Sequence, residues 1–472
     1  MIKLLYNIKF NFSSYFWGLN MKDLTKGNIY KTFILFAIPI VLSGILTNAF
    51  GIINSIIAGK FLGPDGIAAI GATAELQTFI SSVFWGYSTG VAVYIAVLFG
   101  SKNYKDLKTS LFSNFVIIAL ANVLVSALVI LLRDSIFDFL RVDATIRNDA
   151  MKYFIIIFTG QFVIILNTFL GFCMNSIGLS GYPFTMSVIS TVFTIIGNIL
   201  STAVFDFGVE GIAFTSILAA AIVFIFYIRK INRCFGEMGV EAYPLKFSIR
   251  MVGKSISFSV PVTIQQVVMY ISSMLLSPIV NGIGSSATAA YSVVLKIYNI
   301  NAGIYQNSAK TLTNYTAQCI GAGKYKNIKK GLGVGAVQGV LLVVPVLLVC
   351  VLFADNICRA FFPKGYVGES LDFSVMFVKF CLPFIMLNLV NNLFHAFYRG
   401  VQSMGLLIFS TALGSVVRLL ASLVLAKDYG IYGIYAGWII SWAVEAVFSV
   451  LAYCFGIWKK PLRKIIGEDI KK

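Results

Sequence analysis

The chain has 472 residues, of which 58% are apolar and 12% are charged, and its formal net charge is +18. A soluble globular chain carries roughly a quarter charged residues, so this composition excludes an ordinary soluble protein and indicates an all-α integral membrane protein. The positive charge is spread over many loops instead of being gathered on a soluble domain. We therefore expect contact with anionic membrane lipids and no nucleic-acid partner.

The first twenty residues form a basic and aromatic segment. They lack a continuous apolar stretch and a small-residue cleavage site, so they are not interpreted as a signal peptide. Met21 is the more natural start, and whether residues 1–20 belong to the native protein stays open. We expect an interfacial segment here.

Twelve apolar stretches follow, each long enough to cross a hydrocarbon core of about 30 Å as a helix. They lie near 32–57, 68–98, 110–132, 153–178, 184–204, 209–229, 256–280, 287–319, 331–353, 374–398, 405–426 and 432–457. The stretches predict a cytoplasmic or interfacial segment (1–31), an N-terminal lobe (32–229), a cytoplasmic linker (230–255), a C-terminal lobe (256–457) and a cytoplasmic tail (458–472).

The loops show a strong asymmetry of charge. With twelve spans both termini lie on one side, and that side holds 25 of the 37 Lys and Arg, against 8 on the other. The positive-inside rule therefore predicts a multi-pass protein of the cell (inner or plasma) membrane with both termini in the cytoplasm.

The sequence repeats itself at a separation of 221–222 residues. Pro39 and Pro261 occupy the first span of each half, and FGSKNYKDLKTSL from Phe99 aligns with IGAGKYKNIKKGL from Ile320. Six spans per half place both repeats in the same orientation, an arrangement found among secondary transporters. We expect two pseudo-symmetric six-helix lobes.

Polar side chains inside spans mark candidate sites, because they are costly in lipid unless they face a cavity or a partner. Stretch 287–319 has the clearest pattern: a polar stripe at steps of three or four on one helix face. We predict a wet cavity lined by several spans, with a binding set of Asn54, Thr194, Asn198, Gln265, Lys296, Asn299, Asn307, Lys310, Asn388, His395 and Glu445. Structural hydrogen bonding between helices is the alternative for any single Asn or Thr.

Two titratable groups within the C-terminal spans have separate interest. Glu445 needs a partner from another helix, and Lys296 and Lys310 are candidates; the pair could be purely structural or could carry a proton. His395 is the one histidine of the chain, and histidine suits a proton-linked step. The sequence has no catalytic set and no nucleotide-binding motif, so we expect no enzyme activity, no cofactor and coupling to an H⁺ or Na⁺ gradient.

Several segments together resemble the multidrug and toxin extrusion (MATE) family over residues 22 to about 460. They are AIPIVLSGIL, NSIIAGKFLG, AQCIGAGKYKNIKKG, YRGVQSMG, GVEGIA and GIYGIYAG. The resemblance implies a V-shaped bundle of two lobes, alternating access, and export of amphipathic compounds against H⁺ or Na⁺ entry.

The resemblance fails at the acidic positions that it implies for coupling. Asn54 stands where the family commonly has an Asp, and Thr194 and Asn198 stand where proton-coupled members have Asn and Asp. Met269 and Asn388 stand where sodium-coupled members have Glu and Asp. One hypothesis is that coupling has moved to Glu445 or His395; another is that Lys296 and Lys310 favour neutral or anionic substrates.

Three functions remain open. The leading prediction is an ion-driven antiporter, acting as a monomer on a small-molecule substrate. A lipid-linked saccharide flippase is the alternative within transport, and a channel or receptor is the alternative outside it, although no filter-like loop favours a channel.

Overall fold

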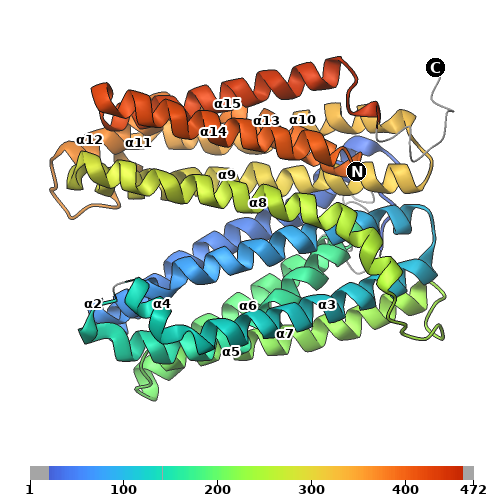
Figure 1. Cartoon of the computed structure of the whole chain (residues 1–472), viewed down its shortest axis with the longest axis horizontal. Helices are drawn as coiled ribbons and strands as arrows, with labels where there is room; N and C mark the ends of the chain where they lie inside the picture. The colour runs from blue at the N-terminus through green and yellow to red at the C-terminus, as the bar shows by residue number, and fades with distance from the viewer. Residues whose placement is uncertain (1–20, 141, 461–472) are drawn as a thin grey trace, which may run out of the picture. The chain divides into compact units, whose positions relative to one another are not determined.

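The computed structural model describes residues 21–140 and 142–460, without the side chains at 48, 52 and 55. Within that part of the chain every regular element is a helix, as Figure 1 shows. The predicted all-α class is therefore confirmed. Most of the predicted N-terminal segment and of the predicted tail lies outside the described residues.

The helices follow one another with short connections. The first half forms α2 (Ile29–Gly100), α3 (Tyr104–Leu131), α4 (Arg133–Phe139), α5 (Ala144–Ser176), α6 (Gly181–Ile199), the π-helical turn η1 (Leu200–Val204) and α7 (Val209–Glu237). The second half forms α8 (Ile249–Ile283), α9 (Ser285–Gly321), α10 (Lys326–Leu352), α11 (Ala354–Arg359), α12 (Glu369–Met376), η2 (Phe377–Cys381), η3 (Leu382–Phe384), α13 (Ile385–Gly400), α14 (Met404–Tyr429) and α15 (Ile431–Cys454).

Ten helical stretches of the described chain are long and apolar enough to cross a membrane. One of them, α2, consists of two helices joined at Gly63, and α9 is a further long helix that is too polar to meet the hydropathy criterion. Together they account for the twelve predicted spans. The polar stripe that makes α9 a candidate site is thus also what lowers its hydropathy.

The internal repeat is visible in the backbone. Gly63 joins the two helices of α2 with φ of 71°, and Gly284, 221 residues later, joins α8 to α9 with φ of 138°. Positive φ favours glycine, which explains the residue type at both joints. The short helices α4 and α11 also correspond at this separation, and both were absent from the predicted elements.

The predicted span 374–398 is interrupted and not one continuous helix. It is built from α12, the π-helical turn η2, the 3-10 turn η3 and α13. Pro383 lies within η3, and a proline has no N–H to continue the helical hydrogen bonds, which accounts for the break. Near the start of this span, a hydrogen bond from Lys379 holds the pKa of Asp355 in α11 below its usual value.

Contacts divide the chain into two units. Of the described residues, unit 1 contains 21–23 and 42–259 and unit 2 contains 24–41 and 260–460, so the main divisions fall beside Pro39 and Pro261. The start of each repeat therefore packs in the unit of the other repeat. In unit 2 the Phe33 ring lies 4.9 Å from that of Tyr315, and in unit 1 the Phe258 ring lies 5.1 Å from that of Tyr94.

Each unit has its own bundle. In unit 1, α5 packs against α3 and α7, and α7 also packs against α6. In unit 2, shown yellow to red in Figure 1, α9 packs against α10, α12 and α13, while α15 packs against α14 and α13. Helices α13, α14 and α15 hold the candidate site described next.

Candidate functional site

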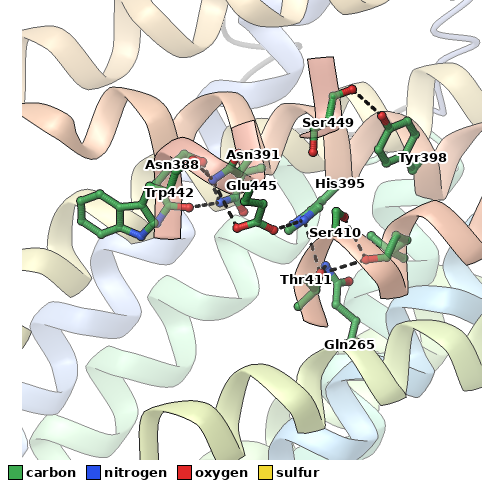
Figure 2. Close-up of polar contacts among 12 residues, drawn as sticks. Gln265, Asn388, Asn391, His395, Tyr398, Ser410, Thr411, Trp442, Glu445 and Ser449 are labelled. Carbon is green, nitrogen blue, oxygen red and sulfur yellow. Dashed lines mark hydrogen bonds and ion pairs between the residues drawn. The ribbon is translucent and has the colours of Figure 1, made fainter. Parts of the chain in front are cut away.

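A buried ion pair joins α13 to α15 in unit 2. His395 Nε2 lies 2.8 Å from Glu445 Oε1, and the two side chains are 6% and 10% exposed. Asn391, one helical turn before His395, donates from Nδ2 to Glu445 Oε2 at 3.2 Å and to the Trp442 carbonyl at 3.1 Å. Figure 2 shows the three side chains converging. Oε2 thus accepts from Asn391, whereas Oε1, although 2.8 Å from His395 Nε2, accepts no hydrogen bond from any described residue.

The prediction that Lys296 or Lys310 pairs with Glu445 is wrong. The partner is His395, which lies on α13 instead of α9. Fifty residues separate the two members in the sequence, so only the packing of α13 on α15 brings them together. The sequence singles out each of them correctly as an unusual intramembrane group, but it carries no signal for the pairing.

Close packing of α14 on α15 brings Glu445 into place. A Cβ added at Gly414 would lie 2.6 Å from Glu445 Oε2. Further along, a Cβ at Gly437 would lie 2.4 Å from Ser422 Oγ, and one at Gly433 would lie 2.3 Å from the Leu425 backbone. Glycines on both helices thus permit the backbones to approach, which is typical of helix packing in membranes.

Thr411 of α14 lies beside His395. Its hydroxyl donates to the Leu407 carbonyl at 2.9 Å and accepts from Gln265 Nε2 at 3.1 Å. It also lies 3.3 Å from His395 Nε2, where the tautomer of the imidazole decides which atom donates. His395 Nε2 is thus placed between the Thr411 hydroxyl and Glu445 Oε1. Through Thr411, the predicted site residue Gln265 of α8 joins the same cluster (Figure 2).

A second network surrounds Asn388 on the same face of α13. Its Nδ2 donates at 2.9 Å to the hydroxyls of Tyr298 and Tyr305 of α9, which lie 3.0 Å from each other. The Tyr298 ring stacks on that of Trp442, with centroids 5.9 Å apart. Asn388 is thus held by tyrosines and belongs to the wall between α9 and α15.

Three predicted residues lie in unit 1, and two of them, Asn54 and Asn198, belong to a neutral network. Asn198 of α6 donates from Nδ2 to Asn54 Oδ1 of α2 at 2.6 Å, and it accepts at Oδ1 from the Thr215 hydroxyl of α7. Thr194, one turn before Asn198, is buried and donates to the Ser190 carbonyl at 2.8 Å. This network holds no ionisable group, so it offers no place for a proton.

The polar stripe of α9 faces away from the core of unit 2. Lys296 and Asn299 are exposed, and Lys296 Nζ lies 5.7 Å from the centre of the Phe361 ring. Asn307 and Lys310 are half-buried, and Lys310 Nζ donates to Asn307 Oδ1 at 2.8 Å. These four residues are therefore separate from the His395–Glu445 pair.

The predicted residues thus fall into three groups instead of one. Gln265, His395 and Glu445 belong to one cluster, with Asn388 beside it; the α9 stripe and the unit 1 network are distinct. Asn391, Thr411 and Gly414 complete the first cluster and were not in the predicted set. Asn391 shares the face of His395, which the helical spacing does reveal, whereas Thr411 and Gly414 have no sequence signal. Within the described residues no group of three His, Cys, Asp or Glu could hold a metal ion.

Comparison with known proteins gives consistent matches. The family model described as MatE matches residues 39–200 and again residues 261–424, so each repeat is matched separately. Among curated proteins, a probable multidrug resistance protein of Bacillus subtilis, YoeA, is 25% identical over 368 residues, covering 74% of this chain and 77% of its own.

Solved structures show the same fold. The Vibrio cholerae MATE transporter VcmN superposes with a TM-score of 0.85 at 17% identity, covering 91% of this chain and 97% of its own. A Pyrococcus furiosus transporter of the MOP superfamily superposes with a TM-score of 0.81 at 14% identity, covering 94% and 97%. That structure is described as having a binding pocket of reverse polarity that suggests a different function.

Proposed function

The chain belongs to the MatE family of membrane transporters, and from this premise we propose that it is a secondary antiporter that exports small amphipathic compounds. The name of its Bacillus subtilis relative favours drug-like substrates. Two lobes that expose their substrate alternately to each side of the membrane would carry out the export. The protein is a multi-pass transporter and not an enzyme.

The observation that carries the coupling proposal is the buried His395–Glu445 pair. Its members are 2.8 Å apart and nearly excluded from solvent. Gain or loss of one proton changes the net charge of the pair by one, and such a change is expensive in a membrane interior. The two protonation states therefore favour different packing of α13 against α15, which is how a local charge can bias a two-state transporter. We propose H⁺ as the coupling ion, with Na⁺ as the alternative.

Two buried amide oxygens beside the pair support access for the proton. Gln265 Oε1 and Asn391 Oδ1 accept no hydrogen bond from any described residue. Buried polar atoms of this kind are commonly satisfied by ordered water. Water bound at these oxygens would give a proton a route that needs no further titratable side chain.

The remaining features of the proposal come from the sequence. The charge asymmetry of the loops favours a cell membrane location with both termini in the cytoplasm. Anionic lipids are the expected partners of the basic loops. We propose a monomer, since each lobe already has its counterpart within the same chain.

The test is a flux measurement in proteoliposomes with a small panel of cationic and anionic compounds. Separate inward gradients of H⁺ and Na⁺ are imposed at constant membrane potential. The proposal expects export driven by the H⁺ gradient and abolished when the gradient is collapsed. Export driven by Na⁺ alone would reassign the ion, and export indifferent to both gradients would overturn the antiport mechanism.

A second candidate is a transporter of neutral or anionic compounds, among them a lipid-linked saccharide. The exposed Lys296 and Asn299 on α9 favour it, and the Pyrococcus furiosus structure of reverse polarity provides a precedent for the fold. Lys296→Gln with Lys310→Gln would then reduce transport of the anionic compounds of the panel. Unchanged anion transport in this double variant would exclude the candidate.

A further inference from the structure

Arg418 is an arginine inside the membrane span α14, and its contacts are all with hydroxyl groups. Its Nη2 donates to Ser272 Oγ at 2.8 Å and to Ser273 Oγ at 3.2 Å, both on α8. Its Nε is buried and donates to no described residue. No carboxylate of the described chain lies within ion-pair distance of it. A guanidinium whose buried Nε–H donates to no described residue is costly in a membrane unless an anion can reach it.

Glu445 lies against α14 one helical turn before Arg418. A Cβ added at Gly414, four residues before Arg418, would lie 2.6 Å from Glu445 Oε2. The Arg418 side chain therefore starts one turn from that carboxylate, and the hydroxyls of Ser272 and Ser273 hold its guanidinium at α8.

Other charged or titratable groups around the pair do not offer the same exchange. Arg399 of α13 donates from Nε to the His395 carbonyl at 3.3 Å, which ties it to the backbone of its own helix. Tyr298 and Tyr305 of α9 are bonded to each other and to Asn388. Lys310 donates to Asn307. Of these groups, only Arg418 combines an unused donor with proximity to Glu445.

The charged groups are confined to one repeat. At the spacing of 222 residues, His395 corresponds to Cys173 and Glu445 to Val223. Residues of α14 correspond to residues of α6 that lie 224 positions earlier. This spacing follows from two equivalent hydrogen bonds, that of Gln265 with Thr411 in unit 2 and that of Ser43 with Ser187 in unit 1. Arg418 then corresponds to Thr194. The first repeat, which the same family model matches, therefore has none of the three.

We propose that Arg418 is the alternative partner of Glu445: the carboxylate pairs with His395 when the pair holds its proton and moves to Arg418 when the proton leaves. This assignment rests on the proposed proton coupling and makes Arg418 a positioning residue. It keeps Glu445 compensated in both states, so neither state leaves an unpaired buried charge. It also links proton loss to a movement of Glu445 from α13 toward α14 and α8.

The experiment measures substrate exchange in proteoliposomes at equal pH on both sides, from pH 5 to 9. Without the positive charge the pair holds its proton to higher pH, so Arg418→Gln is expected to shift the midpoint up by about one pH unit, a tenfold change in proton affinity. Arg418→Lys, which keeps the charge, is expected to stay near the wild-type midpoint. Lys427→Gln removes an exposed charge from the same helix and serves as the matched control.

A second variant tests for a shift of the pH midpoint in the opposite direction, and it does not depend on the folding of Arg418→Gln. Ser272→Ala with Ser273→Ala frees the guanidinium from α8, so the midpoint should shift to lower pH. Unshifted midpoints in both variants, with a pH-dependent wild type, would overturn the role of Arg418 and leave the proton coupling intact. Wild-type exchange that does not vary with pH would instead overturn the proposed coupling itself.

Discussion

At the scale of single residues, Gly414 decides how close α14 can come to Glu445. An added Cβ would lie 2.6 Å from Oε2 and 2.9 Å from Cδ of that side chain. The obstructing atoms are the end of a side chain, which can move, and alanine is the better helix former. We therefore expect Gly414→Ala to change stability by less than about 1 kcal/mol but to displace the carboxylate and weaken the dependence of exchange on pH.

Gly405→Ala is the matched control, since an added Cβ at this position on the same helix meets nothing within 4 Å. Exchange across a pH series, measured for both variants after their yield and monodispersity are compared, checks the prediction. A Gly414→Ala protein with the wild-type pH profile would show that the carboxylate position is not critical.

Lys108 illustrates a charge with a structural role. Its Nζ donates to the carbonyls of Val240, Glu241 and Tyr243 at 2.7–2.9 Å, where the chain leaves α7. Hydrogen bonds to charged groups contribute about 1.5–3 kcal/mol each. We expect Lys108→Met to lower the thermal unfolding midpoint by several degrees.

The repeat provides the control for this prediction. Lys329, the counterpart of Lys108 in the second repeat, is exposed. Lys329→Met should leave the unfolding midpoint unchanged, because its removal affects no buried carbonyl. Equal midpoints for the two variants would contradict the role given to Lys108.

The site could be predicted only in part, because its residues lie far apart along the sequence. Gln265, His395 and Glu445 are recognisable one by one, because a polar or ionisable group is unusual in an apolar span. The pairing of His395 with Glu445 depends on the way α13 packs on α15, and nothing within either segment reports it. The sequence therefore indicates the types of group but leaves their partners undetermined.

At the scale of the elements, lipid accounts for what could be predicted. A backbone in hydrocarbon must satisfy its own hydrogen bonds, so long apolar stretches become helices with few alternatives. The interruption before α13 is less predictable, because prolines inside α8 and α10 are accommodated without such a break. The polar stripe at helical spacing predicts the helix α9. The same stripe makes α9 the most polar of the spans.

The close contact between α2 and the start of α8 can be tested by a substitution at Gly90. A Cβ at Gly90 would lie 2.2 Å from Ser259 Cα, so the obstructing atom belongs to the backbone and cannot turn away. Overpacking of this kind costs about 1–3 kcal/mol, and we expect Gly90→Ala to lower the unfolding midpoint.

Gly253→Ala in α8, the other helix of this contact, is the comparison, because a Cβ added at Gly253 meets nothing within 4 Å. Its midpoint should be unchanged or slightly raised, since alanine favours helix. If both variants unfold at the wild-type temperature, the close contact at Gly90 does not stabilise unit 1.

At the scale of the whole molecule, the two repeats exchange their first segments. Residues 24–41 pack in unit 2, and residues up to 259 pack in unit 1. The predicted lobes 32–229 and 256–457 follow the order of the chain and do not anticipate this exchange, because it depends on contacts far apart in the sequence. Pro39 and Pro261 lie at the exchange points, where the loss of a backbone hydrogen bond makes bending easier.

The proton-coupling account is tested most directly by ΔpH-driven export in a His395→Ala, Glu445→Gln double variant. The measurement compares it with wild type and with Glu75→Gln, which removes an acid from α2. The account predicts that the double variant loses the dependence on ΔpH while substrate exchange without a gradient persists, and that Glu75→Gln keeps it. Full ΔpH dependence in the double variant would contradict the account.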